Sequence, residues 1–240
     1  MGMLKPERIG LDDFADQHVS ICGKSFLAHK SGALYWPAER ALIVADLHLE
    51  KGSAFAARGQ MLPPYDTRET LAKLATMIDR YDPETVISLG DSLHDPDGAA
   101  RMDANDIESL HMLQEDRDWI WITGNHDPKI DRALAGYVLP EIVVEGIALR
   151  HEPRAGAVTH EIAGHFHPAA RLVLHGTSLR RPCFVGNGLR LVLPAFGAYA
   201  GGLNILDLAF EPLFGMDGLA VWMLGHEGLY PVAPRLLKDD

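Results

Sequence analysis

Residues 119–127 constrain the fold of this chain more than any other stretch. Five β-branched or aromatic residues, Trp119–Thr123, run into Gly124, and an asparagine, a histidine and an aspartate follow in succession. The apolar run has the length of a buried strand, and a glycine at its end allows a sharp turn. Asn125 and His126 would then lie at the carboxyl end of a core strand, where open α/β sheets place their ligand sites. Burying these groups unpaired would cost about 2–7 kcal/mol each, so the rest of the chain must supply partners.

An apolar run that ends in polar side chains recurs four more times along the chain. The residues that follow these five runs are Asp46, His48, Asp91, Asn125, His126, His151, His165 and His167. One such cluster is ordinary, because an aspartate after a strand often caps a turn. A single histidine on a strand is also most often a hydrogen-bonded core residue. Five clusters in one chain instead favour one shared site.

Apart from His126, these residues are two aspartates, one asparagine and four histidines. Oxygen and nitrogen ligands without a thiolate suit divalent manganese, iron or zinc. Seven ligands exceed the needs of one ion and fit two ions that share a carboxylate. Two ions about 3.5–4 Å apart can hold both the attacking and the leaving oxygen of a phosphoryl transfer. We therefore predict a site for two divalent metal ions, with Mn²⁺ preferred and Fe or Zn as alternatives.

The elements between the clusters indicate an α/β fold. Strands are expected at 41–45, 85–89 and 119–122, helices at 66–81 and 99–115, and a loop at 49–65. The first of these helices opens with capping-box spacing at Asp66–Glu69. A hairpin at 142–149 and further short strands follow in the second half. We expect a single domain over residues 1–240, with 1–17 and 232–240 peripheral.

Composition narrows the compartment and the kind of partner. With 240 residues and 47% hydrophobic content, the chain can bury one sizeable core. Its net charge of −11 argues against a general basic surface that grips polyanions. Cys22 and Cys183 have no CxxC spacing, which favours the reducing cytoplasm. We expect no secretory signal in Met1–Gln17 and no membrane span, because Pro194 and glycines interrupt the longest apolar stretch.

A family resemblance rests on motifs in a fixed order. They are Asp46-x-His48, Gly90-Asp91, Gly124-Asn125-His126-Asp127, His151 and Gly164-His165-x-His167. This order resembles the calcineurin-like metallophosphoesterase superfamily. The resemblance implies a four-layer α/β/β/α sandwich with its site at the carboxyl ends of strands. It implies one metal on Asp46, His48 and His167, a second on Asn125, His151 and His165, and Asp91 as the bridge. His126 would lie beside the leaving oxygen and bind no metal.

Further residues resemble one branch of this superfamily. They are Asp46–Gly52, Arg58-Gly59 and Leu62–Thr67. The branch is the ligase-associated DNA damage response endonuclease/phosphoesterase group, usually encoded beside an ATP-dependent DNA ligase. It implies a phosphodiesterase that acts on DNA in repair, in functional association with such a ligase. One departure is His94, which stands where many superfamily members carry a second acid after Gly90-Asp91. This departure leaves the fit of the substrate open.

The implied reaction is phosphoester hydrolysis by a metal-activated hydroxide, with His126 stabilising or protonating the departing oxygen. Asp127 would either orient His126 or Asn125, or cap a helix before Pro128. The arginines of the second half, at 150, 154, 171, 180, 181 and 190, either offset the charge of DNA or form a solvated sheet face. No substrate-binding residue is assigned. One alternative is a phosphoesterase acting on a nucleotide or other small phosphoester. The other is a non-catalytic scaffold, against which the complete ligand set argues.

Overall fold

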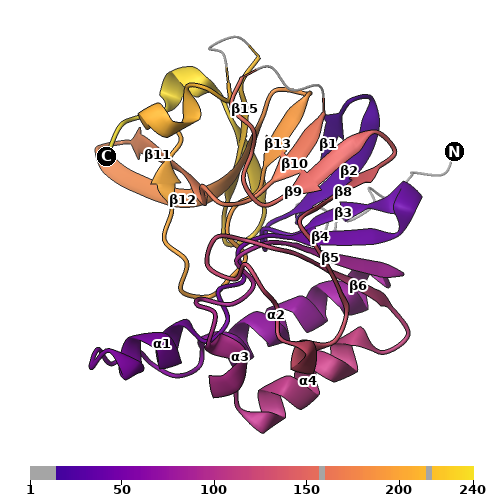
Figure 1. Cartoon of the computed structure of the whole chain (residues 1–240). Coiled ribbons are helices and arrows are strands. Elements are labelled where there is room, and N and C mark those ends of the chain that lie inside the picture. The colour runs from indigo at the N-terminus through magenta and orange to yellow at the C-terminus, as the bar shows by residue number, and fades with distance from the viewer. Residues whose placement is uncertain (1–14, 157–159, 215–217) are drawn as a thin grey trace, which may run out of the picture.

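The computed structural model describes residues 15–156, 160–214 and 218–240. One seven-stranded sheet comes from residues 16–139, and Figure 1 labels its strands β1 to β6. In spatial order its strands are β1 (Asp16–Ile21), β2 (Lys24–His29), β3 (Leu34–Trp36), β4 (Ala41–Val44), β5 (Thr85–Leu89), β6 (Asp118–Ile122) and β7 (Tyr137–Leu139). The first four strands pair antiparallel, and β4 to β7 pair parallel.

The second sheet comes from the second half of the chain. Its path runs through β14 (Leu203–Asn204), β11 (Pro168–Leu174), β12 (Thr177–Gly186), β13 (Arg190–Val192), β10 (Glu161–Ala163), β9 (Ile147–Arg150) and β8 (Glu141–Val144). Beside this path, β15 (Ala220–Leu224) pairs with β12, and β16 (Leu229–Val232) pairs with β15. Strand β10 runs parallel to β9, so these two strands end at the same edge.

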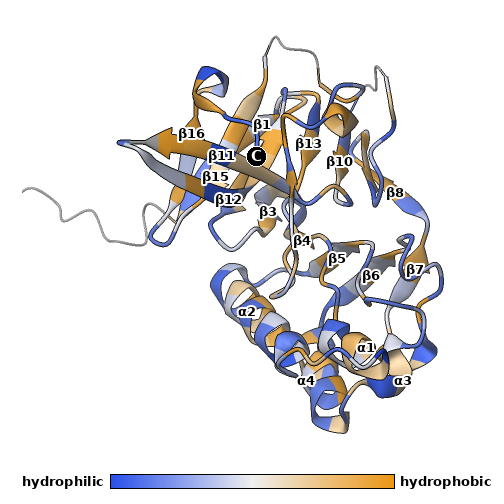
Figure 2. Cartoon of the chain, turned by 90° about the vertical axis from the view of Figure 1, so that its left-hand side faces the viewer, coloured by the Kyte–Doolittle hydropathy of each residue, from blue (hydrophilic) through white to orange (hydrophobic). Residues whose placement is uncertain are grey.

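The α-helices of the described residues all come from the first half and lie on one side of the first sheet (Figure 1). They are α1 (Lys51–Ala57), α2 (Asp66–Tyr81), α3 (Gly98–Arg101) and α4 (Ala104–Gln114). Short 3-10 helices are η2 (Pro37–Glu39), η3 (Arg132–Leu134), η4 (Leu208–Phe210) and η5 (Pro234–Leu236). Figure 2 shows that α2 and α4 carry both hydrophobic and hydrophilic stretches, as expected for helices with one buried face.

Strand β4 and the residue after it show how the first sheet joins two layers. Ala41, Ile43 and Ala45 belong to a hydrophobic cluster shared with strands of the second sheet. Leu42 and Val44 belong to a different cluster, which includes Leu74 of α2 and Leu110 of α4. Successive side chains of a strand point to opposite faces, so a continuous apolar run is needed where both faces are covered.

The α/β sandwich predicted from the sequence is confirmed, with a modest outer layer on the second sheet. There Phe210 of η4 packs with Leu213 and Phe214 against residues of β11, β12 and β15. The tail expected to be peripheral is partly docked, because Leu237 is buried and bridges Leu172. At the other end β1 already begins at Asp16, and residues 1–14 lie outside the described chain.

Two predictions for the helical layer were wrong. Residues 49–65 contain helix α1, and the single helix expected at 99–115 is divided into α3 and α4. The capping-box spacing at Asp66–Glu69 also has another use. Asp66 Oδ2 accepts a hydrogen bond from Gly52 N at 3.1 Å, and Thr67 Oγ1 accepts one from Glu50 N at 2.9 Å. The first turn of α2 therefore holds the start of α1 instead of capping itself.

Candidate metal centre

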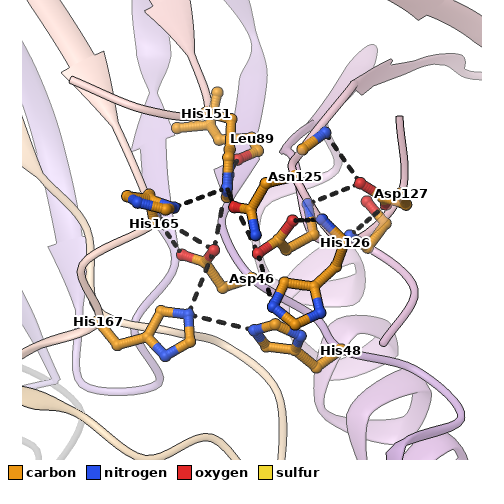
Figure 3. A network of polar contacts seen from close by, with 12 residues as sticks. Asp46, His48, Leu89, Asn125, His126, Asp127, His151, His165 and His167 are labelled. Atoms are coloured by element: carbon orange, nitrogen blue, oxygen red, sulfur yellow. Dashed lines mark hydrogen bonds and ion pairs between the residues drawn. The ribbon is translucent and has the colours of Figure 1, made fainter. Parts of the chain in front are cut away.

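The candidate ligands lie where strands of both sheets end. Asp46 and His48 follow β4, Asp91 follows β5, and Asn125 follows β6. From the second sheet, His151 follows β9, while His165 and His167 follow β10. Figure 3 labels all of these residues except Asp91 and shows the labelled ligand side chains pointing toward one another. The structure thus brings together all seven residues that the sequence predicted to meet.

One group of donor atoms consists of Asp46, His48 and His167, all within 4.8 Å of one another. Nε2 of His167 lies 3.3 Å from Asp46 Oδ1 and 3.2 Å from Nε2 of His48. Asp46 is fully buried, and its carboxylate also accepts the backbone N–H of His165 at 3.0 Å. The first group therefore joins a buried charge to two imidazoles.

The second group consists of Asp91, His151 and His165, again within 4.8 Å. Nε2 of His151 lies 3.4 Å from Asp91 Oδ2 and 3.1 Å from Nδ1 of His165. Asn125 joins this group, because its Oδ1 is 2.9 Å from the same His151 nitrogen. Nδ1 of His151 faces the carbonyl oxygen of Leu89 at 2.9 Å, which leaves Nε2 to face the group.

Glycines precede several of these residues because neighbouring ligands approach closely. A Cβ on Gly164 would lie 2.6 Å from Asp46 Oδ2, and one on Gly124 would collide with Asp91 Oδ1. Gly124 does not adopt a positive φ, so the close approach of Asp91, and not an unusual backbone conformation, requires a glycine here. A side chain at either position would displace a carboxylate from the site.

The ligand backbones are themselves unusual. Asp46, His48, Asp91, His165 and His167 have φ of 54°, 44°, 47°, 73° and 46°, in the left-handed region. Non-glycine residues seldom adopt this conformation, and it clusters at functional sites. Strand β4 ends at Val44, so Asp46 and His48 lie beyond its extended backbone. Their side chains meet through two left-handed residues.

Burial and charge set the protonation of the cluster. Burial, aided by His167, lowers the pKa of His48 to about 3, and burial likewise lowers the pKa of His165. Burial alone would favour neutral His151, yet Asp91 and Asp46 raise its pKa to about 9. Burial opposes the charge of Asp91 too, but His151 and the His126 amide bring its pKa down to about 2. Two imidazoles are therefore neutral, as metal ligands must be, and one carries a proton that a metal would displace.

His126 stands beside the two groups. Its backbone N–H donates to Asp91 Oδ1 at 2.9 Å, and its Nδ1 contacts the carbonyl oxygen of His94 at 2.8 Å. Because a carbonyl only accepts, Nδ1 carries a proton and Nε2 faces away from this contact. The side chain is 40% exposed, and its Nε2 lies 3.9 Å from Asp91 Oδ2.

His94 was singled out only as a departure from the superfamily pattern, and its contacts were missed. Besides its carbonyl bond to His126, its ring lies 5.4 Å from the His126 ring and 5.6 Å from the His48 ring. Donor atoms of the three histidines fall within 4.8 Å of one another. The sequence motif concerns only the side chain at position 94, so it could not predict the hydrogen bond that the His94 carbonyl oxygen accepts.

Asp127 has a role that neither sequence interpretation included. Its carboxylate accepts backbone N–H groups of Asp91, Ser92, Leu93 and Gly124 at 3.0, 2.6, 3.1 and 2.9 Å. It therefore ties the turn after β5 to the turn after β6 and holds Asp91 in position. Burial raises the pKa of Asp127 to about 6, against the effect of these donors.

The donor set fits divalent ions. The close imidazole nitrogens in each group cannot all bear protons, and the carboxylates of Asp46 and Asp91 are buried beside them. Mixed oxygen and imidazole donors of this kind suit Mn²⁺, Fe²⁺ or Zn²⁺. A layered α/β sandwich that gathers such donors at one edge is the framework of a metal-dependent phosphoesterase.

The chain belongs to the calcineurin-like phosphoesterase family, whose pattern matches residues 39–177. It is similar to a solved structure of Pseudomonas putida nuclease MPE, with 31% sequence identity and a TM-score of 0.71. That alignment covers 90% of this chain and 100% of the nuclease. No curated protein matches the chain. Among the described residues, no helix is long and apolar enough to cross a membrane.

Two other structures are more distant, and no argument rests on them. Protein AQ665 of unknown function from Aquifex aeolicus is 16% identical, with a TM-score of 0.39 over 53% of this chain and 78% of that one. The phosphoesterase Yfce from E. coli is 13% identical, with a TM-score of 0.38 over 78% and 88%.

Proposed function

We propose that this phosphoesterase is a binuclear-metal-dependent phosphodiesterase, an endonuclease that acts on DNA. The observation that carries the proposal is the pair of neighbouring donor groups, one containing Asp46 and the other containing Asp91. One metal would be held by Asp46, His48 and His167, the other by Asn125, His151 and His165, and both by Asp91. When bound, two divalent ions supply a water of lowered pKa as nucleophile and offset charge on the phosphoryl oxygens.

Residues around the metal centre would position Asp91 and His126 for the reaction. Asp127 fixes the turn that carries Asp91, and the His126 amide fixes one Asp91 oxygen. The carbonyl of His94 holds the Nδ1 proton of His126. A second proton on Nε2 of His126 can then be donated to the departing oxygen, a general-acid contribution of about 10²–10⁴-fold. Because Nδ1 stays bonded, the ring need not turn while Nε2 gives up its proton.

A nuclease at 31% identity supports a phosphodiester substrate over a monoester. The chain carries a net charge of −11, which two divalent ions would reduce to −7, so attraction for DNA must be local. We propose Mn²⁺ as the metal and a repair role beside an ATP-dependent DNA ligase. We also propose a single domain that works in the cytoplasm, where two free thiols such as Cys22 and Cys183 remain reduced. A nucleotide or other small phosphoester is the alternative substrate.

The test compares substrates with the purified protein and Mn²⁺. We expect cleavage of a single-stranded DNA oligonucleotide and of bis(p-nitrophenyl) phosphate, with much slower hydrolysis of p-nitrophenyl phosphate. Asp91→Ala should abolish all turnover, whereas Asp131→Ala, a change at an exposed residue outside the centre, should retain it. Monoester hydrolysis without diester hydrolysis would favour the alternative, and full activity of Asp91→Ala would contradict the shared metal site.

A further inference from the structure

Arg150, the residue before the candidate ligand His151, is buried without adequate hydrogen bonds. Its side chain is only 9% exposed. Among the described residues, its Nε and Nη1 are buried and have no hydrogen-bond partner. Its ionic neighbours are Glu141, 3.2 Å from Nη2, and Glu161, 3.6 Å from Nε. Unmet donors of this kind destabilise a folded protein. An anion that replaced Glu141 would meet Nη2 and not these two buried nitrogens.

Glu161 lies too far from Nε of Arg150 for a hydrogen bond, and its oxygens accept hydrogen bonds from other groups. Oε1 accepts from Nε of Arg190 at 2.5 Å, and Oε2 accepts from the backbone N–H of Arg154 at 3.3 Å. Both Arg190 and Glu161 are 1% exposed, so Arg190 does not lie on the solvated sheet face considered from the sequence. Glu161 thus lies between two arginines, paired with Arg190 and 3.6 Å from Nε of Arg150.

Arg150 lines a pocket of about 280 Å³ that shares a wall with the metal centre. Asn125 and His151 form that wall, and Glu141 and Arg154 also line the pocket. The volume is close to the lower end of the roughly 300–1,000 Å³ of small-ligand pockets. A molecule bound at the metal centre can therefore continue into this pocket.

Glu141 marks how an anion would sit there. Its Oε2 lies 3.2 Å from Nη2 of Arg150 and 3.2 Å from Nη2 of Arg154. One anionic oxygen between two guanidiniums is an arrangement that phosphate oxygens also adopt. Glu141 is 39% exposed and Arg154 is 63% exposed, so both side chains can move at little cost. Glu152 also lines the pocket, so its two glutamates balance its two arginines. The adjacent metal ions would then make the side of the pocket next to the metal centre attractive to an anion.

We propose that this pocket binds the phosphate next to the scissile one in a polynucleotide strand, with Arg150 and Arg154 taking its oxygens in place of Glu141. The inference rests on the proposed phosphodiesterase function and specifies its substrate as a chain with consecutive phosphates. Substrates with one phosphate have no second phosphate for Arg150 and Arg154 to bind and should not depend on these two arginines. This difference separates the inference from the function on which it rests.

The test is Arg154→Ala, because the Arg154 side chain is exposed and bonds only to Glu141 among the described residues. We expect KM for a DNA oligonucleotide to rise about tenfold, the loss of one charge-assisted hydrogen bond. The slope of log KM against log salt should fall by about 1. Hydrolysis of bis(p-nitrophenyl) phosphate should stay unchanged. The matched control is Lys24→Ala, which removes a cation paired with Glu145 at the turn end of the same β8–β9 hairpin.

Glu141→Gln tests the same pocket in the opposite direction. Removing the competing carboxylate should lower KM for the oligonucleotide about threefold or more, whereas Glu145→Gln should leave it unchanged. If no substrate is turned over, binding can be measured instead. The fluorescence anisotropy of a labelled oligothymidylate, titrated with His126→Ala protein and Mn²⁺, gives a Kd, and each pocket variant is compared with its control in that background. Arg154→Ala behaving like Lys24→Ala in both assays would overturn the inference. An effect confined to a nucleoside triphosphate would overturn the assignment to a polynucleotide.

Discussion

Replacing Asp127 by asparagine should destabilise the protein far more than the loss of one surface charge would. Oδ1 of Asp127 accepts backbone N–H groups from Asp91 and Gly124, and Oδ2 accepts those from Ser92 and Leu93. The side chain is fully buried. In either orientation, an asparagine turns one of these oxygens into an NH₂ group, which cannot accept.

The magnitude follows from the donors left unmet. Two buried N–H groups lose their acceptor, at about 1–3 kcal/mol each, so we expect unfolding to become easier by about 4 kcal/mol. With a urea m-value of about 3 kcal/mol/M, the unfolding midpoint should fall by about 1 M. Since total stabilities of domains are about 5–15 kcal/mol, the variant should still fold.

Urea unfolding followed by circular dichroism in EDTA measures this loss without any contribution from metal. The control is Asp131→Asn, where an exposed carboxylate accepts one amide, that of Ala133 at 2.8 Å, at the start of η3. Asparagine caps as well as aspartate, so this variant should change stability by less than about 0.5 kcal/mol. Equal unfolding midpoints for the two variants would refute the role of Asp127 in holding the two turns together.

Three further predictions concern the metal centre. The His126→Ala variant should keep its metal content, and its turnover of an alkyl diester should fall about 10²–10⁴-fold. The loss should be smaller for a nitrophenyl ester, because only a poor leaving oxygen needs a proton. Equal losses on both esters would argue that His126 only positions the substrate. Mn²⁺ must displace the proton of His151, whose pKa is raised to about 9, so its affinity should increase up to about tenfold per pH unit between about pH 7 and pH 9. Calorimetry across that range measures it, and a flat profile would contradict the protonation given for His151. EDTA should stop catalysis while the circular dichroism spectrum persists, because the clusters on both faces of the first sheet contain no metal ligand; unfolding on chelation would contradict an independent core.

The convergence of the site could be predicted because it depends on strand direction. Asp46, Asp91 and Asn125 follow parallel strands, and the carboxyl ends of parallel strands share an edge. An apolar run followed by a polar residue therefore predicts, from the sequence alone, which residues lie at this edge of the sheet. His151 and His165 follow another parallel pair, β9 and β10. Which edge of the second sheet meets the first sheet was supplied by the family resemblance and not by the runs themselves.

The remaining features depend on backbone atoms and on distant contacts. The carbonyl of His94 and the four amides around Asp127 belong to the main chain, and residue types carry no signal for them. The left-handed backbone at Asp46 and His48 is equally hidden, since aspartate and histidine usually avoid it. Arg190 looks like a surface residue until Glu161, 29 positions earlier, is found buried against it.

The most direct test of the account is anomalous diffraction from crystals grown with excess Mn²⁺. We predict two manganese peaks about 3.5–4 Å apart, with Asp91 between them. Asp46, His48 and His167 should surround one peak, and Asn125, His151 and His165 the other. A single peak, with His151 and His165 turned away from it, would contradict the binuclear centre.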